Sequence, residues 1–215
     1  MDLKSLIKEC RILSKDTVKK YFWQDEEWAA WLSDAEKEAS IRARLIRDSE
    51  EISIAAGDSV VDVPKGLFDI QYAEIRAADG TAYVLQPSSH AELDGLRPGW
   101  RSKSSRPEEY IHNDKTLTLG YVADADYTLF IEFFREPKSP MVSDSDSPEI
   151  NEAHHIHLVE WALHKAYSKP DSDAMNPGKS ALSEEKFNGY FGRRPNADLR
   201  RRQNASRPHR NRTHL

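Results

Sequence analysis

Residues 25–54, DEEWAAWLSDAEKEASIRARLIRDSEEISI, contain the change of pattern that decides the fold. Up to Ile46 the apolar residues recur every three or four positions, which is the period of an α-helix with one buried face. From Ile52 onward apolar and polar residues alternate, which is the period of a β-strand. The sequence therefore predicts a long helix, capped by Asp25, followed by a sheet. The predicted buried side of this helix carries Trp28, Trp31, Leu32, Ala35, Ala39, Arg42, Ala43 and Ile46.

A shorter helix is predicted before this stretch, from the N-cap Asp2 to about Leu13. Its apolar residues recur at helical spacing and form one stripe, made up of Leu3, Leu6, Ile7, Cys10 and Leu13. We therefore interpret Cys10 as a small core residue and not as a nucleophile.

After residue 51, short alternating segments separated by turn residues predict an antiparallel β module over residues 52–136. Asp79-Gly80 and Asn113-Asp114 are its clearest tight turns. A short helical segment is expected within 88–96. Strands are predicted at Ile52–Ile54, Val61–Val63, Tyr72–Arg76, Tyr83–Leu85, Tyr110–Ile111, Thr116–Leu119 and Tyr127–Arg135.

The rest of the chain is predicted to return to helices. Residues 137–150 are rich in Pro, Ser and Asp and are interpreted as a linker. Helices are predicted from Asn151 onward and over about 180–191, which gives a second helical part, 151–192. Residues 1–51 and 151–192 would together form a four-helix bundle body in an α+β protein. The β module, a small sandwich or barrel, would be inserted into this body, and 193–215 would form an extended C-terminal arm.

The composition excludes several classes of protein. The single Cys among 215 residues excludes a disulfide scaffold and a Cys-based zinc site. No apolar run approaches the roughly 18 residues that a membrane helix requires, and the N-terminus does not resemble a signal peptide. We therefore expect a soluble protein made in a reducing compartment, with no cofactor.

Charge is unevenly distributed along the chain. Eight of the 31 basic residues and one of the 36 acidic residues lie in 193–215, so this segment has a net charge of +7 and the remainder −12. All eight are arginines, which can form bidentate pairs with carboxylates on a partner protein. They could equally neutralise a phosphate backbone, or the segment could be a solvated end. All three interpretations remain open at this stage.

A histidine cluster is the densest group of potential ligands. His154, His157 and His164 fall near one face of the predicted helix, with Glu152 and Glu160 nearby. Two imidazoles one turn apart can bind a divalent metal. The His-Glu-x-x-His spacing is absent and no third ligand completes the set, so a structural role is favoured. No active site can be assembled from the sequence, which indicates a protein that is not an enzyme.

Three segments of the sequence resemble the head-to-tail adaptor proteins of tailed bacteriophages. Residues 25–39, DEEWAAWLSDAEKEA, resemble their acidic second helix, although Ser33-Asp34 stands where related sequences tend to have Asn after the Leu. Residues 155–167, HIHLVEWALHKAY, resemble their third helix, and 187–192, FNGYFG, the end of the fourth. The order of the predicted elements agrees over nearly the whole chain.

This resemblance implies a structural virion protein at the phage neck, made in the host cytoplasm. Twelve copies would form a ring beneath the portal, carry the tail nozzle or tail tube, and let double-stranded DNA pass through the lumen without sequence-specific binding. The C-terminal arm would reach the portal. The implied portal-binding residues are Tyr190, Phe191, Arg193, Arg194, Arg200, Arg201, Arg202, Arg207 and Arg210.

Further contact residues are expected at the subunit or tail interface. Tyr21, Phe22 and Trp23 precede the long helix, and aromatic side chains are enriched at protein contacts. Asp79, Asn113 and Asp114 lie in the predicted turns of the β module. Two functions of other classes remain as alternatives, a nucleic-acid-binding protein that uses the Arg-rich arm and a histidine-metal hydrolase.

Overall fold

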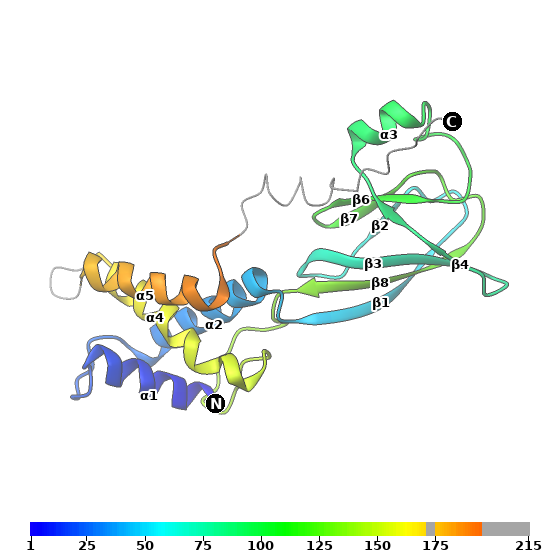
Figure 1. Cartoon of the computed structure of the whole chain (residues 1–215). Coiled ribbons are helices and arrows are strands. Elements are labelled where there is room, and N and C mark those ends of the chain that lie inside the picture. The colour runs from blue at the N-terminus through cyan, green and yellow to red at the C-terminus, as the bar shows by residue number, and fades with distance from the viewer. Residues whose placement is uncertain (171–174, 195–215) are drawn as a thin grey trace. The chain divides into compact units, whose positions relative to one another are not determined.

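The computed structural model describes residues 1–170 and 175–194, and it divides into two compact units (Figure 1). The first, here called the helical unit, consists of residues 1–47 and 134–194. The second, the sheet unit, consists of residues 48–133.

The helical unit is organised around helix α4 (Leu158–Ser168), which contacts α1 (Leu3–Ser14), α2 (Asp25–Ala43) and α5 (Pro177–Phe191). A 3₁₀ helix, η1 (Glu152–His157), leads directly into α4. These helices share one apolar core. Its fully buried members include Leu6, Cys10, Trp28, Leu32, Ala35, Ala39, Leu158, Ala162, Ala166 and Phe187.

The helix ends follow from local hydrogen bonds. Asp2 caps α1 as predicted, because its carboxylate accepts the N–H of Ser5 at 2.9 Å. The prediction for α2 is wrong at both ends. Gln24 is the N-cap, in a capping box with Glu27, and the helix ends at Ala43 because Arg44 adopts a left-handed conformation with φ 52°.

The sheet unit contains two four-stranded sheets with strand orders β1-β8-β3-β4 and β2-β7-β6-β5. Apolar residues of both sheets, among them Ile75, Leu129 and Ile131 from the first and Leu117 and Leu119 from the second, form one core. The strands are β1 (Arg47–Ile54), β2 (Val60–Asp62), β3 (Leu67–Ala77), β4 (Ala82–Val84), β5 (Gln86–Pro87), β6 (Glu109–Asn113), β7 (Thr116–Leu119) and β8 (Tyr127–Arg135).

The segment 82–87 contributes an edge strand to each sheet. Val84 is paired with Glu74 of β3, and the N–H of Leu85 still bonds the carbonyl of Ala73 at 2.9 Å. The next N–H, that of Gln86, bonds the carbonyl of Glu108 at 2.9 Å, next to β6. The chain thus passes from one sheet to the other between Leu85 and Gln86.

A short helix, α3 (His90–Leu96), follows this crossing and covers a small separate core. Ser89 caps it by accepting the N–H of Glu92. This core consists of Leu93, Trp100, Ile111 and Tyr121.

The predicted four-helix bundle is wrong. Within its described residues the chain has five α-helices and two four-stranded sheets, and α3 belongs to the sheet unit. In the helical unit, α1, α2 and α5 each contact α4. The sheets are not purely antiparallel either, since β5 pairs with β6 in parallel. Periodicity indicates which face of a helix is buried, but not which helices share that burial.

Residues 137–150 contain no helix or strand but are held against the helical unit. Met141 and Ile150 are buried in its core. The N–H of Met141 donates to Ser33 Oγ at 3.0 Å, and the N–H of Leu3 donates to the carbonyl of Asp146 at 2.7 Å.

Candidate functional site

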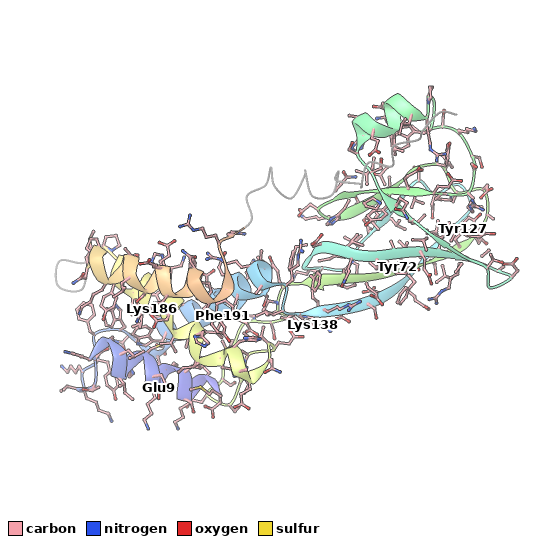
Figure 2. The ribbon with its side chains drawn as sticks, viewed as in Figure 1. Glu9, Tyr72, Tyr127, Lys138, Lys186 and Phe191 are labelled. Atoms are coloured by element: carbon pink, nitrogen blue, oxygen red, sulfur yellow. The ribbon has the colours of Figure 1, made fainter. Side chains whose placement is uncertain are left out.

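The C-terminal end of α5 is the last described part of the chain before the Arg-rich segment. Phe187 and Phe191 point into the core and are buried, whereas Tyr190 is 45% exposed. Figure 2 shows Phe191 at this end of the helix. Gly192 ends α5 with φ 84°, a conformation that glycine adopts without steric cost. Arg193 and Arg194 follow and are exposed.

Two histidines of η1 hold Tyr190 from the side. The His157 ring is stacked on the Tyr190 ring, with centroids 3.5 Å apart, and His154 Nδ1 lies 3.1 Å from the Tyr190 hydroxyl. Both histidines also contact the ring of Phe191. The histidine face that the sequence predicts therefore fixes the end of α5.

Arg42 of α2 holds the same end from another side. Its Nη1 donates to Asn188 Oδ1 and to the carbonyl of Gly192, at 2.5 and 3.5 Å. Its guanidinium lies 4.7 Å from the Trp161 ring and 5.1 Å from the Phe187 ring, within the range of cation–π contacts.

Glu38 joins Arg42 to the start of the arm. Its Oε2 accepts from Arg42 at 3.0 Å, and its Oε1 accepts from Arg194 at 2.9 Å. The side chains of Glu38 and Arg42 are only 9% and 6% exposed, whereas that of Arg194 is 54% exposed. The buried Glu38 carboxylate thus has one buried partner, Arg42, and one exposed partner, Arg194. We name Glu38, Arg42, Asn188 and Arg194 the arm root.

The other histidines have structural hydrogen bonds. His155 is buried, and its Nε2 lies 2.9 Å from the carbonyl of Ile150. His164 Nδ1 lies 2.9 Å from Ser180 Oγ and so joins α4 to α5. In the part of the chain that the structure describes, no three His, Cys, Asp or Glu side chains are grouped so that they could hold a metal ion.

The predicted aromatic contact residues differ in exposure. Trp23 is buried in the helical core, where its ring contacts Trp28 and Tyr167. Tyr21 lies under the Arg11 guanidinium at 3.6 Å. Phe22 is the most exposed of the three, at 44%, so it is the member of this group best placed to contact a partner directly.

The predicted turn residues are exposed and well defined. Asp79 accepts the N–H of Thr81 at 2.8 Å, and this hydrogen bond lowers the pKa of its carboxyl group. Asn113 donates to Thr118 Oγ1 at 2.8 Å, and Asp114 has φ 60°. Arg200, Arg201, Arg202, Arg207 and Arg210 lie outside the described residues.

A surface hollow of about 520 Å³ lies between α2 and α4 in the helical unit. Its lining consists of Glu26, Glu27, Ala30, Trp31, Lys165, Ser168 and Lys169, a set without His or Cys. Among the described residues, no helix combines the length and the apolar character needed to cross a membrane.

Comparison with known families gives a match along nearly the whole chain. The model of the family described as SU10 adaptor protein matches residues 1–212. The chain belongs to this adaptor family. No curated protein sequence matches the chain.

Membership of the SU10 adaptor family gives the chain a structural role as a phage head-to-tail adaptor. The family implies contact with portal and tail proteins in the neck of the virion. The portal-facing and tail-facing residues of an adaptor must then be sought among exposed side chains, because a partner protein can contact only these.

Sequence reasoning missed three members of the arm root, Glu38, Arg42 and Asn188. One signal was present, because Glu38 and Arg42 are four residues apart, the spacing at which opposite charges meet on a helix. Their link to Asn188 and Arg194 joins residues about 150 positions apart, which no local pattern encodes.

Proposed function

We propose that this adaptor forms a ring, of twelve copies, that joins the portal to the tail nozzle or tail tube. The observation that carries the proposal is the match of the adaptor family over residues 1–212, which include most of the Arg-rich arm. The proposal places the protein in the virion neck after its synthesis in the host cytoplasm.

The arm is proposed as the portal-binding element. Its root is fixed to the helical unit, while Tyr190, Arg193 and Arg194 remain exposed beside it. An exposed aromatic ring next to arginines is typical of residues that dominate binding energy at protein interfaces. The arm would therefore dock through Tyr190 and its arginines, with the buried Phe191 supporting the ring of Tyr190 at a centroid distance of 4.8 Å.

The lumen is proposed to conduct DNA without binding it. Outside the arm the chain carries a net charge of −12, which repels a phosphate backbone. The contact with the tail is proposed for the exposed turns at Asp79, Asn113 and Asp114 of the sheet unit.

The test is deletion of residues 193–215, measured as mass gain on the portal from the same source by light scattering. We expect the intact protein to add about twelve copies and the truncated protein to fold normally without docking. As a matched control, the variant Lys65→Glu/Asp62→Lys changes two exposed charges of the sheet unit and should dock like the wild type. Docking by the truncated protein would refute the role of the arm.

The same preparations separate portal binding from binding of nucleic acid. If the arm grips DNA directly, duplex binding by the intact protein falls steeply with salt, in proportion to the phosphates neutralised. We expect portal docking without appreciable duplex binding at physiological salt.

A further inference from the structure

The two ends of α1 present surfaces of different charge. The C-terminal end leads into the loop 15–22, which contains Lys15, Lys19 and Lys20. All three lysines are exposed, and none has an ion-pair partner among the described residues. Lys179, at the start of α5, lines the same surface hollow of about 300 Å³ as Lys15 and Phe22. Two of the acids near this loop, Asp16 and Asp25, are already paired with Arg11.

Exposed apolar side chains lie within this basic end. Leu13, Val18 and Phe22 are 51%, 75% and 44% exposed, and Met175, which lines the same hollow, is 53% exposed. Apolar groups surrounded by charges of one sign are typical of a contact surface with a charged rim. We name this surface the basic end.

The N-terminal end of α1 is covered by the segment 142–156, which is acidic. The N–H groups of Leu3 and Lys4 donate to the carbonyls of Asp146 and Asp144, so this segment is fixed to the first turn of the helix. The side chains of Asp144 and Glu152 are 74% and 80% exposed. Asp144 lies 3.9 Å from the Lys4 ammonium group, and Glu152 lies 3.0 Å from the N-terminal ammonium group.

Exposed apolar side chains are present at this acidic end too. Val142 is 77% exposed and Ile156 is 44% exposed. The acidic end, like the basic end, therefore combines exposed apolar side chains with exposed charged ones, but its charge is negative. The helix that separates them has 12 residues, about 18 Å in length, and Figure 1 shows the loop after α1 and the N-terminus at opposite ends of it.

We propose that the basic end of one copy binds the acidic end of a second copy. Two different, complementary surfaces on opposite sides of a subunit produce a head-to-tail contact, which forms a ring when the rotation between successive copies closes and an open filament when it does not. The opposite charges fix the orientation and exclude like-with-like pairing, while Val18, Phe22, Val142 and Ile156 supply apolar area. The proposal rests on the ring of the proposed function, but its test requires no portal.

The first measurement is zero-length carbodiimide cross-linking of the full-length protein at about 100 μM and low salt, followed by peptide mass spectrometry. A mixture of ¹⁵N-labelled and unlabelled subunits distinguishes links between copies from links within one copy. We expect mixed-isotope links that join Lys15, Lys19, Lys20 or Lys179 to Asp144 or Glu152. Links that mostly involve other lysines and acids, or no links between copies, overturn the proposal.

The second measurement uses charge-reversal variants, whose self-association is measured by analytical ultracentrifugation under the same conditions. Lys19→Glu/Lys20→Glu and Asp144→Lys/Glu152→Lys should each abolish self-association, whereas a mixture of the two variants, or all four changes in one chain, should restore it. The control Lys65→Glu/Asp62→Lys should associate like the wild type. Failure of both the mixture and the fourfold variant to associate, with normal circular dichroism spectra, contradicts the proposal even if portal docking is intact.

Discussion

Arg194 Nη1 lies 2.9 Å from Glu38 Oε1, so the first residues of the arm are tied to a buried carboxylate of α2. When Arg194 moves away, Glu38 stays paired with Arg42, and no buried charge is left without a partner. The contact can therefore open and close without disturbing the core, whereas loss of Arg42 would leave Glu38 uncompensated.

Arg194→Ala should loosen the root of the arm, and Arg193→Ala should not. The two residues are adjacent, exposed and of equal charge, but only Arg194 bonds Glu38. Because exposed ion pairs contribute below about 1 kcal/mol, global stability should barely change. Hydrogen exchange of the amides of 189–194 should rise by up to about fivefold in Arg194→Ala alone. Equal exchange in both variants would contradict this role of Arg194.

Tyr190→Ala and Phe191→Ala should separate docking from folding. Phe191 is buried, so its truncation should lower the free energy of unfolding by about 3–5 kcal/mol. Tyr190 is half exposed, so its truncation should cost about 1 kcal/mol or less but weaken portal docking. Urea unfolding and portal titration measure the two effects. A Tyr190→Ala protein that docks normally would remove Tyr190 from the proposed interface.

Glu36→Gln should change how stability depends on pH. Burial raises the pKa of Glu36 above its ordinary value, although its carboxylate accepts the N–H groups of Glu149 and Ile150. The folded state then binds this proton more tightly than the unfolded state, so unfolding free energy falls as pH rises from the ordinary glutamate pKa through the raised one.

Glutamine keeps the acceptor oxygen without the charge, so Glu36→Gln should be at least as stable as the wild type at pH 7. Urea midpoints between pH 4 and pH 8 should show a difference between variant and wild type that increases with pH. The exposed Glu185→Gln serves as control. A difference that decreases with pH would have the wrong sign for a buried carboxyl group.

Cys10 should react with a thiol reagent only when the helical unit opens. Its side chain is fully buried, and burial raises its pKa, so the reactive thiolate is both rare and inaccessible. Reaction with 5,5′-dithiobis(2-nitrobenzoate) should be immediate in denaturant and slow in buffer, where its rate follows opening. Immediate stoichiometric reaction of the native protein would be inconsistent with the buried position.

The sequence predicted what local chemistry determines. The cap at Asp2 is confirmed, and so is the burial of the predicted stripe of α1 as far as Cys10, but Leu13 at its end is 51% exposed. The end of α2 could not be read, because Ile46 keeps the helical spacing although the helix ends at Ala43. Ile46 is instead buried in the helical core from the loop between α2 and β1. Burial was therefore predicted correctly at this position, and backbone conformation was not.

The candidate site was only partly predictable for a similar reason. Tyr190 and the arginines after it stand out in composition, so they could be proposed from the sequence. Trp23 could not be distinguished from Phe22, because adjacent aromatic residues give no indication of which one the fold buries. The contact between Glu38 and Arg194 depends on how α2 and α5 meet, which is a property of tertiary packing.

The strand segment 82–87 also determines how the sheet unit bears load. Two sheets that are held together only by side-chain contacts and hydrogen bonds can slide past each other, because no covalent bond resists the sliding. Here the covalent backbone between Leu85 and Gln86 joins β4 of one sheet to β5 of the other, so tension passes between these two edge strands through covalent bonds. In an adaptor of the virion neck, we expect this connection to make the two sheets move together under load.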